Sequence, residues 1–158
     1  MKFVSTRLKS PALNFEETVM QGLAPDGGLY VPEFLPQFDE QYIAKMTRMN
    51  YEEIFFEITK HFVGDEIPNN DYKDIIAKSY KTFSHKAIAP LKQLDSQHYL
   101  LELFHGPTLA FKDFALQFLG NLLDYFLTKR NQKIAIIGAT SGDTGSAAIQ
   151  GCMKCKNA

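Results

Sequence analysis

A lysine in an apolar stretch is the first residue of this sequence whose surroundings suggest chemistry. Lys112 lies in residues 104–120, where a His-Gly-Pro-Thr turn at residues 105–108 precedes a long apolar run. Proline and threonine at such a turn favour a helix start, the threonine by capping free N–H groups. If the helix runs over residues 109–130, a rotation of about 100° per residue places Lys112 on its apolar face. The opposite, polar stripe consists of Asp113, Gln117, Gly120, Asn121, Asp124 and Thr128.

An amine on a buried face can act as a nucleophile. Burial disfavours the charged ammonium form, and a neutral lysine amine forms Schiff bases with aldehydes. The alternative is that Lys112 extends its head to solvent or pairs with a carboxylate, as most lysines near apolar surfaces do. Periodicity therefore makes Lys112 a candidate and leaves both interpretations open.

A glycine-rich loop is the second chemical feature. Residues 138–145, Gly-Ala-Thr-Ser-Gly-Asp-Thr-Gly, follow the apolar segment Lys133–Ile137 and precede a helix start at Ser146. A loop between the end of a strand and the start of a helix suits anions. Its glycine spacing matches neither the dinucleotide fingerprint nor a Walker A loop. The glycines also fit a purely geometric role, so anion binding is one of two interpretations.

The elements around these features predict an α/β protein. A strand over residues 98–104, the helix from 109, a buried strand over 133–137 and a helix after the glycine-rich loop form a βαβα run, which is typical of a parallel sheet. The preceding part reads as mainly helical, with a hairpin turn near its start. We predict an amino-terminal region, residues 1–86, and an α/β region, residues 87–158. Within the first, we expect a helix over 15–23 between Asn14 and Gly22, a turn over 25–28, a strand over 29–32, and helices over 51–63 and from 69 onward.

Composition excludes several classes. The chain has 158 residues and a formal net charge of −1, so we expect no nucleic-acid partner. No apolar run is long enough to cross a bilayer, and charge interrupts the first residues too early for a signal peptide. We therefore expect a cytoplasmic protein. Cys152 and Cys155 form a lone Cys-x-x-Cys without further ligands, and we predict no metal site.

Three segments resemble the threonine synthase family, in its longer bacterial and fungal form. Residues 105–118 are similar to the family's pyridoxal-phosphate lysine motif, and residues 139–147 to its second signature. The start matches too, at Phe3-Val-Ser-Thr-Arg, Phe15-Glu-Glu-Thr-Val and residues 22–33. The resemblance implies a fold-type II pyridoxal-phosphate enzyme, with a mainly helical amino-terminal region followed by the start of the parallel-sheet domain. It also implies conversion of O-phospho-L-homoserine and water to L-threonine and phosphate.

The resemblance assigns roles to residues. Lys112 is expected to bind pyridoxal phosphate as a Schiff base and then to shuttle protons. Asp143 is expected to meet the cofactor ring substituent. The loop is expected to bind the substrate carboxylate, through Thr140, Ser141, Gly142, Asp143 and Thr144.

The chain supplies two candidate strands where a parallel sheet normally has more. The family's cofactor-phosphate loop and its partner for the pyridine nitrogen are also not among these residues. We therefore expect the amino-terminal part of a longer protein, without synthase activity by itself. Two alternatives remain: a related phospholyase that eliminates phosphate without hydration, or a non-catalytic module in which Lys112 is structural.

Overall fold

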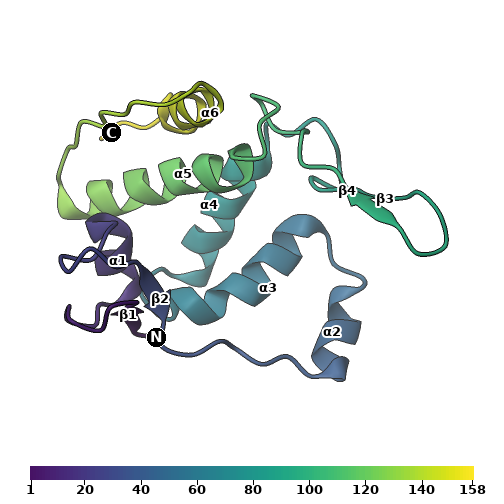
Figure 1. The fold of residues 1–158 in the computed structure, drawn as a ribbon, viewed down its shortest axis with the longest axis horizontal. Coiled ribbons are helices and arrows are strands. Elements are labelled where there is room, and N and C mark those ends of the chain that lie inside the picture. Colours follow the sequence, from purple (N-terminus) through teal and green to yellow (C-terminus); the bar gives the residue numbers. More distant parts are fainter. The chain divides into compact units, whose positions relative to one another are not determined.

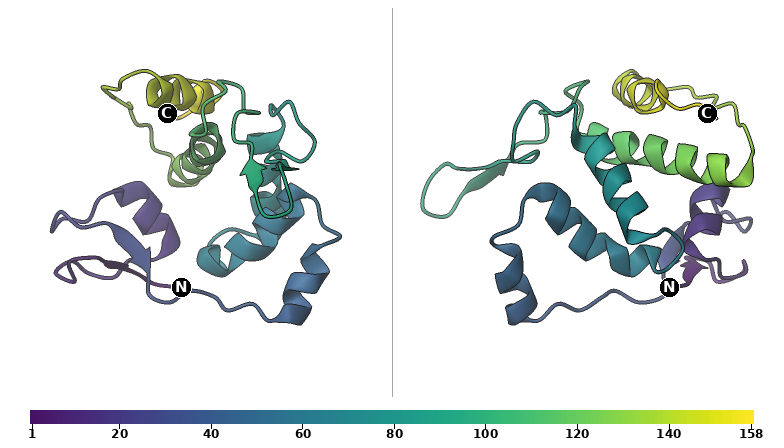
Figure 2. Two further views of the ribbon diagram at one scale, coloured as in Figure 1. Left: turned by 45° about the vertical axis from the view of Figure 1, so that its right-hand side comes forward. Right: turned by 180° about the vertical axis from the view of Figure 1, so that it is seen from behind.

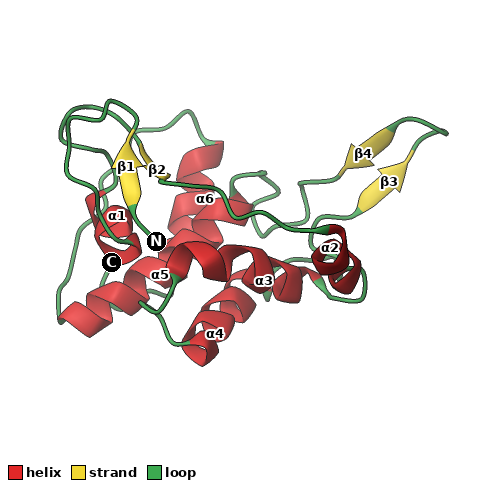
Figure 3. Ribbon diagram, turned by 90° about the horizontal axis from the view of Figure 1, so that it is seen from below, coloured by secondary structure: helices red, strands yellow, loops and turns green.

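Helices are the main regular elements of the structure, a computed structural model that describes residues 1–158 (Figure 1). Strands occur only as short two-stranded ribbons (Figure 3). The chain divides into two compact units: a first unit of residues 1–49 and 53–72, and a second unit of residues 50–52 and 73–158. The boundary passes through two helices, α3 (Tyr51–Val63) and α4 (Asn69–Tyr80).

In the first unit, an antiparallel ribbon joins the amino-terminal residues to the segment after the turn at 25–28. β1 (Phe3–Ser5) pairs with β2 (Tyr30–Pro32). In the turn, Gly27 has a φ of 78°, and a Cβ on Gly28 would overlap the hydroxyl of Ser5. Both glycines are therefore required by local geometry. The expected hairpin turn is confirmed, since a β-bridge closes it.

The first helix is defined at both ends by the predicted residues. α1 (Phe15–Gln21) starts with a capping box, in which the Asn14 side chain accepts the N–H of Glu17 and the Glu17 carboxylate accepts the N–H of Asn14. Gly22, with a φ of 70°, ends it. Glu66, distant in sequence, accepts the N–H groups of the first two helical residues at 2.9 and 2.8 Å. Its carboxylate satisfies donors that every helix start leaves free.

The helices expected over residues 51–63 and from 69 onward are present as α3 and α4. In the first unit their side chains meet at Phe56 and Tyr72, whose ring centroids are 5.9 Å apart, and the Tyr72 hydroxyl donates to Thr59 at 2.8 Å. α2 (Glu40–Met46) lies in the region expected to be helical, but no pattern had defined it as a separate helix. Its cap is Asp39, whose side chain accepts the N–H of the third helical residue.

In the second unit, α5 (Asp113–Arg130) and α6 (Asp143–Cys152) lie side by side, as the two views of Figure 2 show. Their closest approach is at two glycines. A Cβ on Gly120 would overlap the carbonyl of Gly151, and a Cβ on Gly151 would overlap a carbonyl of α5. Glycine is needed where two backbones come this close. Asn131, with a φ of 51°, ends α5 where the sequence predicted.

An aromatic cluster anchors the first turn of α5. The ring centroids of Tyr51 and Tyr80 are 4.9 Å apart, those of Tyr80 and Phe83 5.3 Å, and those of Phe83 and Phe114 5.0 Å. The Tyr80 hydroxyl also donates to the carbonyl of Phe114 at 3.1 Å. Edge-on aromatic pairs contribute about 0.5–1.5 kcal/mol each beyond the burial of their area. The cluster therefore stabilises the helix start that follows Lys112.

The strand expected over residues 98–104 is shorter and belongs to a local hairpin. β4 (Tyr99–Leu101) pairs antiparallel with β3 (Leu91–Gln93). In the turn between them, Asp95 Oδ1 accepts the N–H groups of Gln97 and His98, both at 2.9 Å. The hairpin projects from the rest of the second unit (Figure 2). Its pairing is antiparallel because the connection is a short turn, whereas parallel pairing requires a long crossover.

The strand expected over residues 133–137 is not formed. This segment runs without strand pairing between α5 and α6, and the Ile137 side chain is 95% exposed. A strand requires a neighbouring backbone to accept and donate its hydrogen bonds, and no strand of this chain lies beside it. The backbone N–H of Ile134 instead donates to Asn157 at 2.9 Å. The prediction of a strand at residues 133–137 was therefore wrong for this chain, and its two ribbons contain no parallel pair.

Candidate active site

Lys112 lies at the N-cap position of α5. The periodicity of the sequence had predicted a position within the helix. α5 begins later than expected because Leu109 has a φ of 65°, which is outside the helical region. The expectation that the face carrying Lys112 is the buried one was also wrong. Asp113 and Gln117, on the polar stripe opposite Lys112, are 0% and 5% exposed. Lys112 itself is half-buried.

The carboxylate of Asp113 closes the turn that carries Lys112. It accepts the backbone N–H of Thr108 at 2.8 Å and the Thr108 hydroxyl at 2.9 Å. Thr108 therefore donates its hydroxyl hydrogen to Asp113. The prediction that it caps N–H groups of the helix was wrong. Gly106 packs directly against this carboxylate, because a Cβ there would overlap it. These contacts hold residues 105–113 in one closed turn that contains Lys112, which we call the lysine turn.

The first residue of the turn, His105, is held from two sides. Its ring nitrogen Nε2 lies 2.7 Å from Glu102 Oε2, and its ring centroid lies 5.0 Å from that of His85, with the two rings tilted by 44°. Its carbonyl accepts the backbone N–H of Ser84 at 2.9 Å. Both ends of the lysine turn are therefore fixed by hydrogen bonds within the second unit.

The glycine-rich loop is organised by Thr140. Its hydroxyl oxygen accepts the N–H groups of Gly142 and Gly145 at 3.2 and 3.1 Å. α6 begins at Asp143, three residues earlier than predicted, so Asp143 and Thr144 form its first turn. Gly142, at a φ of 143°, is the N-cap and takes a conformation that side chains disfavour. Ser141, Gly142 and Asp143 are exposed, whereas Thr144 is half-buried.

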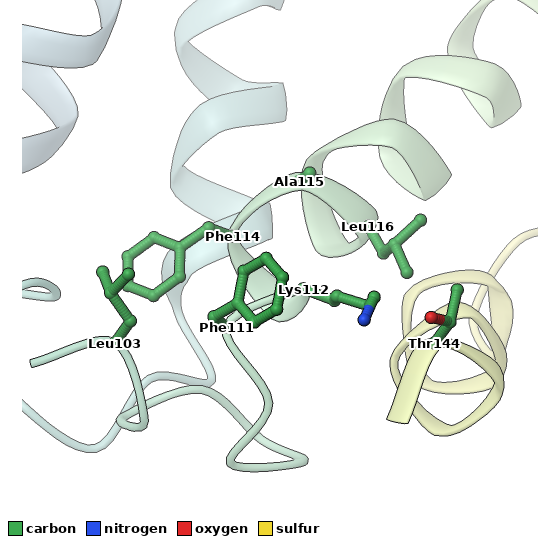
Figure 4. A pocket seen from close by; sticks show the side chains of 7 residues that line it. All are labelled: Leu103, Phe111, Lys112, Phe114, Ala115, Leu116 and Thr144. Atoms are coloured by element: carbon green, nitrogen blue, oxygen red, sulfur yellow. The ribbon is translucent and has the colours of Figure 1, made fainter. Parts of the chain in front are cut away.

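A pocket of about 460 Å³ brings the lysine turn and the start of α6 together (Figure 4). The Lys112 side chain extends from the start of α5 toward Thr144 on α6. The other lining residues are apolar: Leu103, Phe111, Phe114, Ala115 and Leu116. Of the predicted site residues, the pocket therefore unites Lys112 and Thr144. Thr140, Ser141, Gly142 and Asp143 lie on the adjoining loop and helix start and do not line it.

The pocket suits an aldehyde that also carries negative charge. One amine projects among apolar side chains, with Nζ 4.7 Å from the centroid of the Phe111 ring. The amino end of α6, which offers backbone N–H groups and the positive end of a helix dipole, adjoins the same space through Thr144. Such residues fit a cofactor with an aldehyde and an anionic group.

Two buried residues near Lys112 had no role in the sequence analysis. Gln117 Nε2 donates to Asp113 Oδ1 at 3.0 Å and to the carbonyl of Ala147 on α6 at 3.2 Å. The sequence analysis placed both residues only on the polar stripe of the helix, and polar side chains usually lie at the surface. The missed signal is the spacing of Asp113 and Gln117, which are four residues apart and hence neighbours on a helix. A threonine just before the helix adds a donor for the acid.

No group of three or more histidine, cysteine, aspartate or glutamate side chains in the structure could hold a metal ion. Cys155 of the Cys-x-x-Cys pair donates from its thiol to the carbonyl of Gly120 at 3.3 Å. None of the helices has the length and apolar character needed to cross a membrane.

The fold and the two signatures match threonine synthases. The structure superimposes on the PLP-bound threonine synthase of Brucella melitensis with a TM-score of 0.97 at 46% identity, over 99% of this chain and 34% of that chain. For the yeast threonine synthase the TM-score is 0.93 at 43% identity, over 99% of this chain and 34% of that one. The expected fold class, the amino-terminal part of that architecture, is confirmed.

The family model for the threonine synthase N terminus matches residues 2–80. The chain belongs to the threonine synthase family. It is 55% identical to the threonine synthase of Pseudomonas aeruginosa, over 99% of this chain and 34% of the relative. It is also 40% identical to human Threonine synthase-like 2, over 99% of this chain and 33% of the relative. The chain therefore spans about a third of the length of the curated relatives it matches.

Proposed function

We propose that the protein containing these residues is a threonine synthase that converts O-phospho-L-homoserine and water to L-threonine and phosphate. The observation that carries the proposal is the position of Lys112, whose amine extends into an apolar pocket toward the first turn of α6. Family membership and the similarity to a structure described as PLP-bound support pyridoxal phosphate as the cofactor.

Lys112 is the proposed covalent anchor for the aldehyde and, once freed, the base that moves protons at the substrate carbons. When bound, pyridoxal phosphate supplies an electron sink for carbanion chemistry. The chain's own contribution is to hold the half-buried amine among apolar side chains. Asp143 is proposed to face the cofactor. The substrate-binding loop is proposed to comprise Thr140, Ser141, Gly142, Asp143 and Thr144.

A substitution of Lys112 in the full-length protein tests the proposal. Incubation with pyridoxal phosphate and borohydride, followed by peptide mapping, should place one reduced adduct on Lys112 of the unsubstituted protein. Lys112→Ala should lose this adduct and threonine formation together. Lys86→Ala, at an exposed lysine of the same unit, is the matched control and should retain both. An adduct pattern unchanged by Lys112→Ala would refute the assignment.

A phospholyase is the second candidate, because the relatives include a protein named as only synthase-like. Both reactions release phosphate from O-phospho-L-homoserine, so phosphate assays do not separate them. Analysis of the organic product does: threonine supports the synthase, whereas 2-oxobutyrate supports the lyase. A Lys112→Ala variant of the full-length protein that keeps its cofactor colour would support the non-catalytic alternative, in which Lys112 is structural.

The division into residues 1–86 and 87–158 stays a prediction, as does the expected inactivity of residues 1–158 by themselves. Activity of this stretch alone comparable with that of a full-length relative would contradict the second of these. The test requires only purified residues 1–158, pyridoxal phosphate and the substrate.

A further inference from the structure

Two buried hydrogen bonds from Gln117 connect the two sides of the pocket, which are the start of α5 and the start of α6. A carboxamide NH₂ group has two donor hydrogens, and Gln117 donates to two acceptors, Asp113 Oδ1 at 3.0 Å and the Ala147 carbonyl at 3.2 Å. The Gln117 side chain is 5% exposed, and Asp113 and Ala147 are both 0% exposed. The donor capacity of this buried amide is thus fully used by the protein.

Each of the two acceptors is near a residue of the proposed site. Asp113 directly follows Lys112 and holds its turn through Thr108. Ala147 lies in α6 about one helical turn after Thr144. Displacement of Gln117 would therefore change the lysine turn and the start of α6 together.

We propose that Gln117 is a positioning residue that sets the placement of α6, and with it Thr144, relative to the Lys112 amine. The proposal rests on the proposed function, in which the pocket between Lys112 and Thr144 holds the reacting groups. Gln117 does not line that pocket, so it acts through Asp113 and Ala147. The contact of Gly120 with Gly151 fixes how closely the helices pack farther along. Gln117 provides the polar contact at the end nearer the site.

Two substitutions remove the donors in different ways. Gln117→Met keeps the length of the side chain and removes both hydrogen bonds, which leaves two buried acceptors without this donor. Gln117→Glu keeps the shape, but a carboxyl group has at most one donor hydrogen and cannot serve both acceptors. Gln132→Glu makes the same chemical change at an exposed glutamine just after α5 and serves as the control.

A double substitution separates the effects of the two hydrogen bonds, the one to Asp113 and the one to Ala147. In Asp113→Asn with Gln117→Glu, the introduced amide can donate to the introduced carboxylate while its oxygen still accepts from Thr108. The bond between positions 113 and 117 is thereby restored in reverse, whereas the bond to Ala147 is not. The lysine turn should recover in this variant, and the start of α6 should not.

The experiment measures the order of α6 and the reactivity of the Lys112 amine, both in the full-length protein. Amide hydrogen exchange of the peptide over residues 143–150 reports on α6 and needs no cofactor. The ratio of borohydride-trapped adduct on Lys112 to adducts on exposed lysines reports on the amine. Steady-state kinetics with O-phospho-L-homoserine separates kcat from KM, and thermal unfolding records stability.

With Gln117→Met and Gln117→Glu we expect faster exchange over residues 143–150, a lower Lys112 adduct ratio, and a kcat lower by about 10- to 100-fold with a smaller change in KM. Gln132→Glu should match the unsubstituted protein. The inference is overturned if both Gln117 variants lose only thermal stability, with exchange and adduct ratio unchanged. If the unsubstituted protein forms no Lys112 adduct, the proposed function fails instead. The exchange measurement then still decides whether Gln117 orders α6.

Discussion

The carboxylate of Asp113 accepts both the backbone N–H and the hydroxyl of Thr108, at 2.8 and 2.9 Å. These bonds close a turn over five residues, and Lys112 is the last residue before the acid. The direction of the lysine side chain is therefore set by a carboxylate beneath it rather than by a position on a helix face. The contribution of the Thr108 hydroxyl to stability can therefore be tested by substituting Thr108 alone.

Thr108→Val should destabilise the protein by about 1–2 kcal/mol, because it removes a donor to a buried carboxylate while keeping the shape of the side chain. Thr108→Ser retains the hydroxyl and should lose less than half as much. Urea unfolding of the full-length protein gives both values. Equal stability of the two variants would show that the hydroxyl contributes nothing to the turn.

Gly120→Ala should destabilise the packing of α5 on α6 by about 1–3 kcal/mol, since its methyl group would overlap the Gly151 carbonyl. The gain in helix propensity from glycine to alanine, about 1 kcal/mol, opposes this loss only in part. Gly138→Ala is the matched control, because a Cβ there has nothing within 4 Å. Thermal unfolding distinguishes them, and a stabilised Gly120→Ala variant would contradict the close contact.

Cys155 should react slowly with iodoacetamide. Burial, together with the nearby Cys152 and Asp124, raises the pKa of the Cys155 thiol from 9 to about 12. Because the thiolate is the reactive form, we expect labelling of the native protein at pH 8 to be at least about tenfold slower than after denaturation. Peptide mapping assigns the labelled cysteine, and Cys152→Ser removes the neighbouring thiol as a control. Native labelling of Cys155 at the denatured rate would exclude this burial.

The same raised pKa predicts how stability changes with pH. In the unfolded chain the thiol loses its proton near pH 9, whereas in the folded protein it keeps it up to about pH 12. The unfolded state therefore binds fewer protons in this window, and stability falls as pH rises from 9 toward 12. Cys155→Ala should show a weaker fall in melting temperature over that range. An identical fall in both proteins would assign it to other groups.

Asp26 should remain ionised well below the usual range of aspartate. Desolvation acts to raise its pKa, but hydrogen bonds from the Ser5 hydroxyl and from the backbone N–H groups of Gly28 and Lys9 outweigh it and lower the pKa to about 2. Its support of the turn is present above pH 4 and is lost as pH falls toward 2. Ser5→Ala should raise the Asp26 pKa in an NMR titration, whereas Thr47→Ala, in the same unit, should not.

Local signals predicted what depends on neighbouring residues. Asn14 and Gly22 bound α1 because a cap and a left-handed stop act within one helical turn, and the turn at residues 25–28 follows from its glycines. Prediction failed for the burial of Asp113 and Gln117. Their spacing and the nearby Thr108 are local signals, but their burial also depends on the Ala147 carbonyl of α6, which accepts from Gln117 across 30 residues of sequence.

The position of Lys112 illustrates both cases. Its candidacy came from a position on the apolar face of a helix, whereas the structure places it at the N-cap of α5, beside apolar side chains that include Leu116. The motif over residues 105–118 singled out the same lysine by resemblance, and in the structure Lys112 lines a pocket together with Thr144 of α6. The cofactor-binding role of Lys112 stays a prediction.

The unpaired stretch at residues 133–137 has a consequence for handling these residues. Ile134 and Ile136 are 38% and 52% exposed, and Ile137 is almost fully so. A short β-prone, apolar segment that lacks a neighbouring strand can pair with the same segment of another molecule. Residues 1–158 produced alone should therefore precipitate in a concentration-dependent manner and bind amyloid-sensitive dyes. Replacing Ile136 by lysine would interrupt such stacking and act as a gatekeeper against fibril growth.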